Sequence, residues 1–157
     1  MAHFDGAIRQ AVHALKYRDC RVIARDLGEL MADWWKEHPM PADVVVPVPL
    51  HAERLRDRGY NQAALLARAF ADQTDLPLDE TTLIRHRSTA TQTELDADQR
   101  RENVKDAFQC TSMALIDRRV LLIDDVCTTG ATLASCAIAL CDGGASEVRG
   151  LTLARSL

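Results

Sequence analysis

Residues 120–133 read VLLIDDVCTTGATL and decide the fold class. The stretch opens with four apolar residues without alternation, a pattern typical of a strand buried on both faces of a sheet. Two carboxylates, Asp124 and Asp125, follow, and then a turn of small and hydroxyl-bearing residues at 128–132. Apolar residues recur at helical spacing from 133 to 141, and two glycines then indicate the end of a helix. The stretch therefore predicts a strand, a loop and a helix.

This order of elements predicts a phosphate site beside the acidic pair. Ligands of open α/β sheets bind at the carboxyl ends of the strands, where Asp124 and Asp125 are expected. Residues 128–132 would lie at a helix N-terminus, where backbone N–H groups lack partners within the helix and can bind an anion. Three threonines in this turn add hydroxyl donors. With a phosphate on the loop, the carboxylates suit the vicinal hydroxyls of a sugar or a divalent cation.

Other classes of protein also place acids after an apolar run. A P-loop NTPase needs GxxxxGK[ST] and a dinucleotide-binding fold needs GxGxxG, and neither string occurs. A phospho-acceptor receiver domain has most of its sheet after the acidic pair, whereas only 32 of the 157 residues follow Asp125. A buried strand with a polar exit and no ligand remains as the structural alternative.

The same residues resemble the phosphoribosyl-pyrophosphate (PRPP) motif of type I phosphoribosyltransferases, in which four apolar residues, two acids and a Thr-Thr-Gly-x-Thr loop hold the ribose 5-phosphate. Two further segments, VPVPLHAERLRDRGYNQA at 46–63 and TQTELDADQRRENVKDAF at 91–108, are similar to the ComF/GntX branch of that family. The matches span most of residues 43–157. The resemblance implies that the 5-phosphate binds at Thr128, Thr129, Gly130, Ala131 and Thr132.

The elements and the resemblance together predict an α/β fold, with a doubly wound, mostly parallel sheet of four or five strands and N-terminal helices. Residues 1–157 would form a single domain, in which residues 42–157 are the PRPP-binding core. Residues 1–41 would contain two amphipathic helices, over 3–18 and from 23 onward, which either pack on the core or form a hood over a substrate base. The other expected elements are strands at 43–49, 82–84, 107–108 and 148–153 and a helix over 61–74.

A basic cluster follows the first strand of the expected core. Arg54, Arg56 and Arg58 alternate in this acidic protein, and guanidinium groups match phosphate oxygens. Composition alone leaves a solvated face open. The resemblance aligns the segment with the pyrophosphate-binding loop of the family. We therefore expect His51, Arg54 and Arg58 to bind pyrophosphate and Arg56 to point elsewhere.

The chain turns polar over residues 88–103, directly after the basic residues 85–87. This segment contains a single large apolar residue, so it is either a surface loop or a lid over a polyanion. The flexible catalytic loop of type I phosphoribosyltransferases occupies the corresponding place. The resemblance thus implies that Arg100 and Arg101 reach the pyrophosphate, with Gln92 and Asn103 as polar helpers.

The chemistry that the resemblance implies is transfer of a phosphoribosyl group from PRPP to a nucleobase-like acceptor, with Mg²⁺ as cofactor and pyrophosphate released. Asp124 and Asp125 would hold the ribose hydroxyls and the Mg²⁺, and would act with Arg100 and Arg101 in catalysis. No sequence pattern signals a pocket for the base. The alternative is a non-catalytic PRPP- or nucleotide-binding module that acts through a partner in DNA uptake or recombination. A homodimer is also left open.

Composition limits the classes of binding partner and the cellular compartments in which this function is expected. A net charge of −4 and a pI near 5.7 argue against direct nucleic-acid binding, which favours basic surfaces. Residues 1–20 carry several charges and do not resemble a signal peptide, and no apolar run is long enough for a membrane span. Five cysteines without a CxxC pair predict reduced thiols in the cytoplasm. The four-cysteine zinc ribbon common in this branch is absent from the sequence, so we expect no structural zinc.

Overall fold

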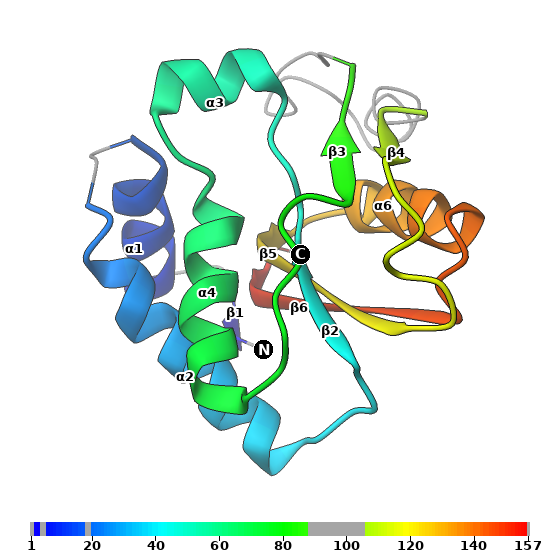
Figure 1. The fold of residues 1–157 in the computed structure, drawn as a ribbon. Coiled ribbons are helices and arrows are strands. Elements are labelled where there is room, and N and C mark those ends of the chain that lie inside the picture. The colour runs from blue at the N-terminus through cyan, green and yellow to red at the C-terminus, as the bar shows by residue number, and fades with distance from the viewer. Residues whose placement is uncertain (1, 4–5, 18–19, 88–105, 157) are drawn as a thin grey trace.

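A four-stranded parallel sheet lies at the centre of the protein (Figure 1). The computed structural model describes residues 2–3, 6–17, 20–87 and 106–156. Neighbouring strands of the sheet follow the order β1-β6-β5-β2, and each pair is parallel. The strands are β1 (Ala2–His3), β2 (Val44–Pro47), β5 (Arg119–Cys127) and β6 (Glu147–Arg155).

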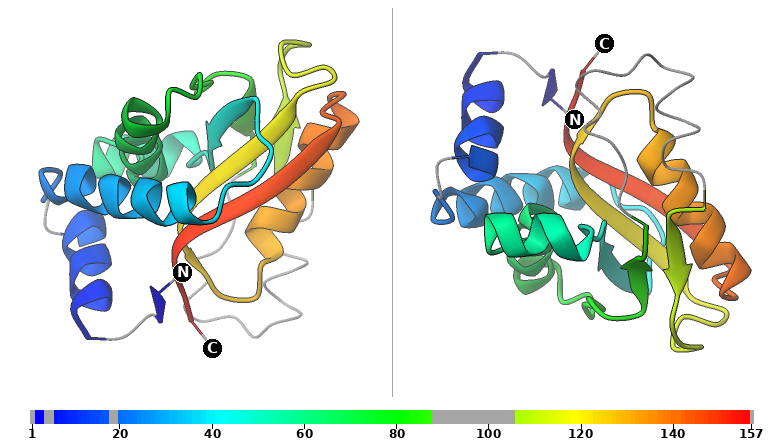
Figure 2. Two further views of the ribbon diagram at one scale, coloured as in Figure 1. Left: turned by 90° about the horizontal axis from the view of Figure 1, so that it is seen from below. Right: turned by 90° about the horizontal axis from the view of Figure 1, so that it is seen from above.

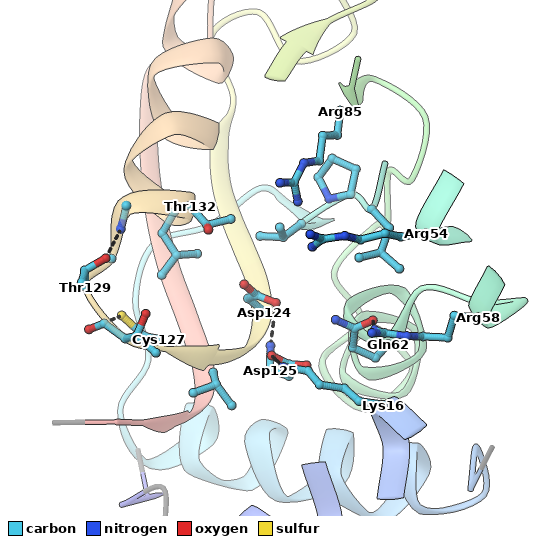
Figure 3. A pocket seen from close by; sticks show the side chains of 18 of the residues that line it. Lys16, Arg54, Arg58, Gln62, Arg85, Asp124, Asp125, Cys127, Thr129 and Thr132 are labelled. Carbon is cyan, nitrogen blue, oxygen red and sulfur yellow. Dashed lines mark hydrogen bonds and ion pairs between the residues drawn. The ribbon is translucent and has the colours of Figure 1, made fainter. Parts of the chain in front are cut away.

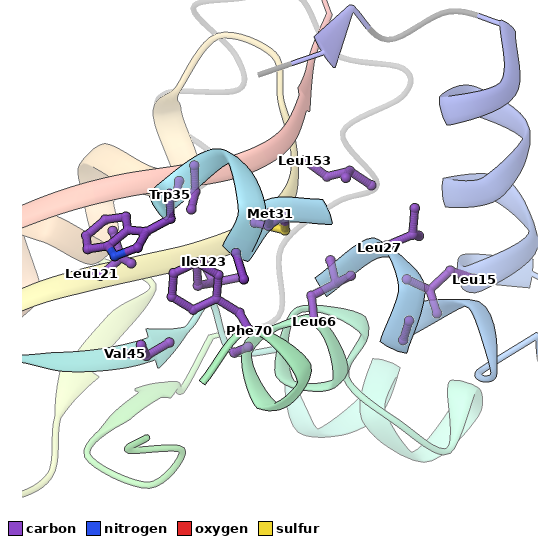
Figure 4. Packing of buried hydrophobic residues seen from close by; sticks show 14 of the residues in the cluster. Leu15, Leu27, Met31, Trp35, Val45, Leu66, Phe70, Leu121, Ile123 and Leu153 are labelled. Carbon is purple, nitrogen blue, oxygen red and sulfur yellow. The ribbon is translucent and has the colours of Figure 1, made fainter. Parts of the chain in front are cut away.

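Helices cover both faces of this sheet (Figure 2). Alternate residues of a strand point to opposite faces. Leu121 and Ile123 of β5 accordingly pack with one group of helices (Figure 4), whereas Val120 and Leu122 pack on the other face. The first face carries α1 (Gly6–Tyr17), α2 (Ile23–Glu37) and α4 (Gln62–Thr74), and the second carries α6 (Ala131–Asp142). The predicted doubly wound, mostly parallel α/β fold with N-terminal helices is thus confirmed.

Two of the expected strands differ from the prediction made from the sequence. Residues 107–108 do not rejoin the main sheet: β4 (Phe108–Cys110) pairs antiparallel with β3 (Leu83–Arg85) in a separate two-stranded sheet. The outer edge of β2 is already occupied, because the Val45 N–H donates to the Pro77 carbonyl at 2.8 Å and the Asp79 N–H donates to the Val45 carbonyl at 2.9 Å.

The N-terminus also begins differently from the expected helix over 3–18. Residues 2–3 form β1 and pair with Ala154 and Arg155 at the end of β6, and α1 starts only at Gly6. β6 has β5 on one side, so its other edge can bond this short strand. Within the described part of the chain, none of the helices has the length and apolar character needed to cross a bilayer.

Gly28 sets how closely α2 approaches α4. A Cβ at this position would lie 2.4 Å from the Ala69 Cβ and 2.9 Å from the Leu66 carbonyl oxygen. Gly28→Ala should therefore lower the free energy of unfolding by up to about 2 kcal/mol, because overpacking costs about 1 to 3 kcal/mol while the better helix propensity of alanine returns about 1. Chemical denaturation would measure this loss.

The matched control for Gly28→Ala removes the opposing methyl group. Adding Ala69→Gly should recover part of the lost stability, after subtraction of the effect of Ala69→Gly alone, because the 2.4 Å contact disappears. Strictly additive effects of the two substitutions would show that the contact does not limit the approach of the helices.

Candidate functional site

A pocket opens at the carboxyl end of the sheet, between α1, the end of β5 and the start of α6 (Figure 3). Segments that are far apart in the sequence meet around it, at the edge where the sequence predicts a ligand. Its lining consists of Lys16 and Tyr17 of α1, residues 48–50 after β2, Arg54 and Arg58, Gln62 of α4, Arg85 of β3, and residues 124–133.

The acidic pair lies within β5 and not after it. β2 pairs with β5 only as far as Ile123, whereas β6 continues alongside Asp124 and beyond. Neighbouring residues of a strand point to opposite faces, so Asp124 and Asp125 do not lie side by side. Asp125 points toward α1, and its Oδ1 lies 2.9 Å from Lys16 Nζ. The two carboxylates therefore have different surroundings.

The pKa of Asp124 is strongly raised by its surroundings. Its burial, together with the negative charge of Asp125, raises the pKa of its carboxyl group from 3.8 to about 7, while Lys16 and Arg85 act in the opposite direction. Its Oδ1 accepts a hydrogen bond from the Asp125 N–H at 2.8 Å. A charged carboxylate here is costly without a partner, so a cation or hydroxyl donors in the pocket would favour the ionised form.

The two carboxylates differ in how well they can bind a metal ion or a sugar. Oxygen ligands of the carboxylate type suit Mg²⁺, and Asp124 presents one to the pocket. Asp125 is 2% exposed, and its Oδ2 is buried without a hydrogen-bond partner among the described residues. In this part of the chain no group of three or more His, Cys, Asp or Glu side chains could hold a metal by itself. Beyond these residues, water and the oxygens of a bound substrate are the ligands that Mg²⁺ commonly takes.

The predicted phosphate loop leads into a helix N-terminus. Gly130 adopts φ 78° and caps α6, which begins at Ala131. A positive φ is a conformation that glycine adopts without strain. The Ala131 N–H donates to Thr129 Oγ1 at 3.3 Å, so one donor of the loop is used internally. The first N–H groups of an α-helix generally lack a carbonyl partner within the helix, so a helix N-terminus is a favourable place for an anion.

The arginine cluster forms a helix, α3 (Ala52–Arg58), which the sequence analysis does not predict. Arg54 and Arg58 are four residues apart, so they share a helix face, and both line the pocket. Arg56 is exposed and is not part of the lining. His51 lies outside the lining too: it is the N-cap of α3, and its Nδ1 accepts from the Glu53 N–H at 3.3 Å.

Several lining residues carry no clear signal in the sequence. Gln62 is buried and accepts a hydrogen bond from Arg58. Arg85 is buried with its guanidinium 5.3 Å from the centre of the Phe108 ring, and burial together with the charge of Arg54 lowers its pKa. The basic residues 85–87 are visible at a strand end, but nothing in the sequence indicates that one turns into the site. Lys16 lies on an amphipathic helix that the sequence analysis places in a hood or in core packing.

The pocket is therefore dominated by positive charge. Lys16, Arg54, Arg58 and Arg85 line it together with the two carboxylates. Such a balance suits a polyanion that also carries hydroxyl groups. The predicted catalytic arginines, Arg100 and Arg101, and the predicted helpers Gln92 and Asn103 lie outside the described residues.

Comparison with solved structures defines the class of fold. The chain superimposes on a glutamine PRPP amidotransferase from B. subtilis with a TM-score of 0.58 and 21% sequence identity, over 85% of this chain and 26% of that chain. A second structure, of the allosteric regulatory enzyme of purine biosynthesis, matches with a TM-score of 0.56 and 22% identity, over 85% of this chain and 26% of that chain. The protein thus has a type I phosphoribosyltransferase fold.

Sequence comparison then shows the family, although no family model matches the chain. DNA utilization protein YhgH of Escherichia coli K12 is 37% identical, over 100% of this chain and 71% of that protein. Competence protein F of Haemophilus influenzae is 37% identical over 87% of this chain and 61% of that protein. Competence protein ComFC of Bacillus subtilis is 29% identical over 98% and 62%. The chain belongs to this competence protein F family, and it spans about two thirds of the length of these relatives.

Proposed function

We propose that the protein binds PRPP in this pocket and transfers its phosphoribosyl group to a nucleobase-like acceptor. The observation that carries the proposal is the meeting of four basic side chains, a helix N-terminus and two carboxylates in one pocket. Residues 128–132 would bind the 5-phosphate, Asp124 and Asp125 the ribose, and Arg54 and Arg58 the pyrophosphate.

In the proposed reaction, the bond from the ribose anomeric carbon to the pyrophosphate oxygen breaks, and a bond to a ring nitrogen of the acceptor forms. The proton of that nitrogen passes to water or to the released pyrophosphate. Positive charge develops on the ribose ring while negative charge collects on the leaving group. Asp124 would stabilise the ring, and Arg54, Arg58, Arg100 and Arg101 would stabilise the pyrophosphate. Mg²⁺, held by Asp124 and the substrate oxygens, would supply further neutralisation of the leaving group.

Calorimetry with PRPP and Mg²⁺ tests the binding step. Thr128→Val keeps the shape of the side chain and removes a hydroxyl from the pocket lining, so it should weaken PRPP about two- to tenfold. The control is Thr111→Val on the exposed surface, where the hydroxyl donates to the Thr82 carbonyl. Wild-type protein that fails to bind PRPP, or equal affinities in both variants, would contradict the assignment of the phosphate loop.

A second function, a PRPP-binding module without catalysis, is favoured by the names of the relatives. These proteins are named for competence and DNA utilization and not for a base. Pyrophosphate release from PRPP in the presence of purine and pyrimidine bases separates the two. Tight binding of PRPP without base-dependent release of pyrophosphate would show that the protein is a binding module and not a transferase.

A further inference from the structure

Lys16 brings a positive charge from α1 to the most buried carboxylate of the pocket. Its Nζ lies 2.9 Å from Asp125 Oδ1, and the two side chains are 24% and 4% exposed (Figure 3). The ion pair of Arg25 with Glu29, on the surface of α2, has side chains that are 80% and 38% exposed. Because Lys16 and Asp125 are largely withdrawn from water, their attraction is screened less than that of a surface pair.

The end of α1 is held in place on both sides of Lys16. The Leu15 carbonyl accepts a hydrogen bond from the buried Tyr60 hydroxyl. The Tyr17 ring lies 5.7 Å from the guanidinium carbon of Arg58. Leu15 itself is fully buried. These contacts fix the backbone around Lys16, so its ammonium group is delivered to Asp125 by the fold and not by a freely moving surface side chain.

The geometry points to Lys16 as a resident cation that occupies Asp125 in place of a divalent metal and leaves the buried Oδ2 of Asp125 to accept a sugar hydroxyl. Oδ1 is already bound to the ammonium group, whereas Oδ2 has no partner among the residues described. Asp124 points to the other face of the sheet, so the two carboxylates do not converge on one ion. A divalent metal would then enter with the substrate and meet Asp124 only.

Removal of the ammonium group should open Asp125 itself to a divalent metal. Lys16→Met keeps most of the aliphatic stem and leaves Asp125 without this cation. Electron paramagnetic resonance without PRPP measures the affinity of the metal-free full chain for Mn²⁺. This affinity should increase at least about tenfold in Lys16→Met, which is the scale of one charge-assisted contact. Lys16→Arg should bind Mn²⁺ as the wild type does, because the positive charge stays.

Two further variants separate this effect from general charge. Lys36→Met removes an equal charge from an exposed pair with Asp33 on α2 and should leave Mn²⁺ affinity unchanged. Adding Asp125→Asn to Lys16→Met should abolish the gain. Affinity in Lys16→Met equal to the wild type, or an equal gain in Lys36→Met, would overturn the inference.

A further measurement leaves Lys16 unchanged, so it tests the inference even if the Lys16 variants do not fold. In the otherwise wild-type chain, Asp125→Asn should leave Mn²⁺ affinity unchanged, because Lys16 and not a metal occupies that carboxylate. A tenfold weaker affinity in this variant would make Asp125 a metal ligand and overturn the inference.

The part that concerns the sugar rests on the proposed function, whereas the metal measurements do not. Lys16→Met should weaken PRPP about tenfold, with partial rescue by Lys16→Arg, because Asp125 loses the partner that orients it. A wild-type protein that does not bind PRPP would refute the proposed function and leave the metal result standing. Unchanged PRPP affinity in Lys16→Met, with PRPP bound by the wild type, would refute the positioning role.

Discussion

Asp124→Asn should raise the free energy of unfolding at pH 8 by up to about 4 kcal/mol. Burial and the charge of Asp125 raise the pKa of the native carboxyl group to about 7, from its ordinary value of 3.8. Between these values the folded protein binds a proton that the unfolded chain does not. The contribution of Asp124 to stability therefore falls as pH rises from about 4 to 7 and stays low above that. Asparagine carries no charge and still offers an oxygen to the Asp125 N–H.

The measurement is a series of urea denaturation curves from pH 4 to pH 8. The gap between variant and wild type should open across this range and level off above about pH 7. Asp72→Asn, an equal charge change on the exposed side of α4, is the control, and its gap at pH 8 should be smaller than that of Asp124→Asn. A constant gap for Asp124→Asn, or a loss of stability at pH 8, would show that the charged carboxylate is not strained in the folded protein.

Arg54→Ala should weaken PRPP by about tenfold to 150-fold while leaving ribose 5-phosphate nearly unaffected. Only PRPP carries the pyrophosphate, and Arg54 lines the pocket from α3, an element separate from the phosphate loop at 128–132 (Figure 3). A charge-assisted contact in a partly desolvated site is worth on the order of 1.5 to 3 kcal/mol, against less than about 1 for a surface charge. Calorimetry with both ligands at fixed salt and Mg²⁺ would measure the difference.

The helix α3 offers its own control. Arg56 belongs to the same turn of helix as Arg54 but is exposed and lies outside the pocket lining. Arg56→Ala should change the affinity for PRPP less than twofold. Equal losses for PRPP and ribose 5-phosphate in Arg54→Ala would mean that the arginine acts through general charge. A larger loss in Arg56→Ala than in Arg54→Ala would place the pyrophosphate on the other side of α3.

The strongest local patterns predicted the fold best. The continuous apolar run of residues 120–123 is a central strand because both of its faces are covered, and the small residues after 127 do lead into a helix. Residues 52–58 were expected in a loop with alternating arginines, because a short segment rich in charge shows no apolar periodicity, whereas they form the helix α3. The orientation of Arg54 and Arg58 follows from helix geometry and not from strand alternation.

The composition of the site depends on contacts that no local pattern contains. Lys16 precedes Asp125 by more than a hundred positions, and only the packing of α1 on the sheet brings them together. Arg85 enters the pocket because β3 pairs with β4 outside the main sheet, a pairing that the sequence analysis did not predict. The acidic pair stands out in the sequence, but its division between two faces of the sheet follows from the extension of β5 as far as Cys127.

The strand order β1-β6-β5-β2 determines when each strand can pair with its neighbours during synthesis on the ribosome. The central strand begins at Arg119, which pairs with Asp43 across a separation of 76 residues. Until that strand has been made, β2 lacks its β5 partner, and the faces of α1, α2 and α4 that pack on the sheet are not covered by β5 or β6. Pairings between such distant segments form slowly, and the exposed apolar faces of a nascent chain favour aggregation. A nascent chain that stops before residue 119 should therefore need a chaperone to stay in solution, whereas one completed through β6 should not.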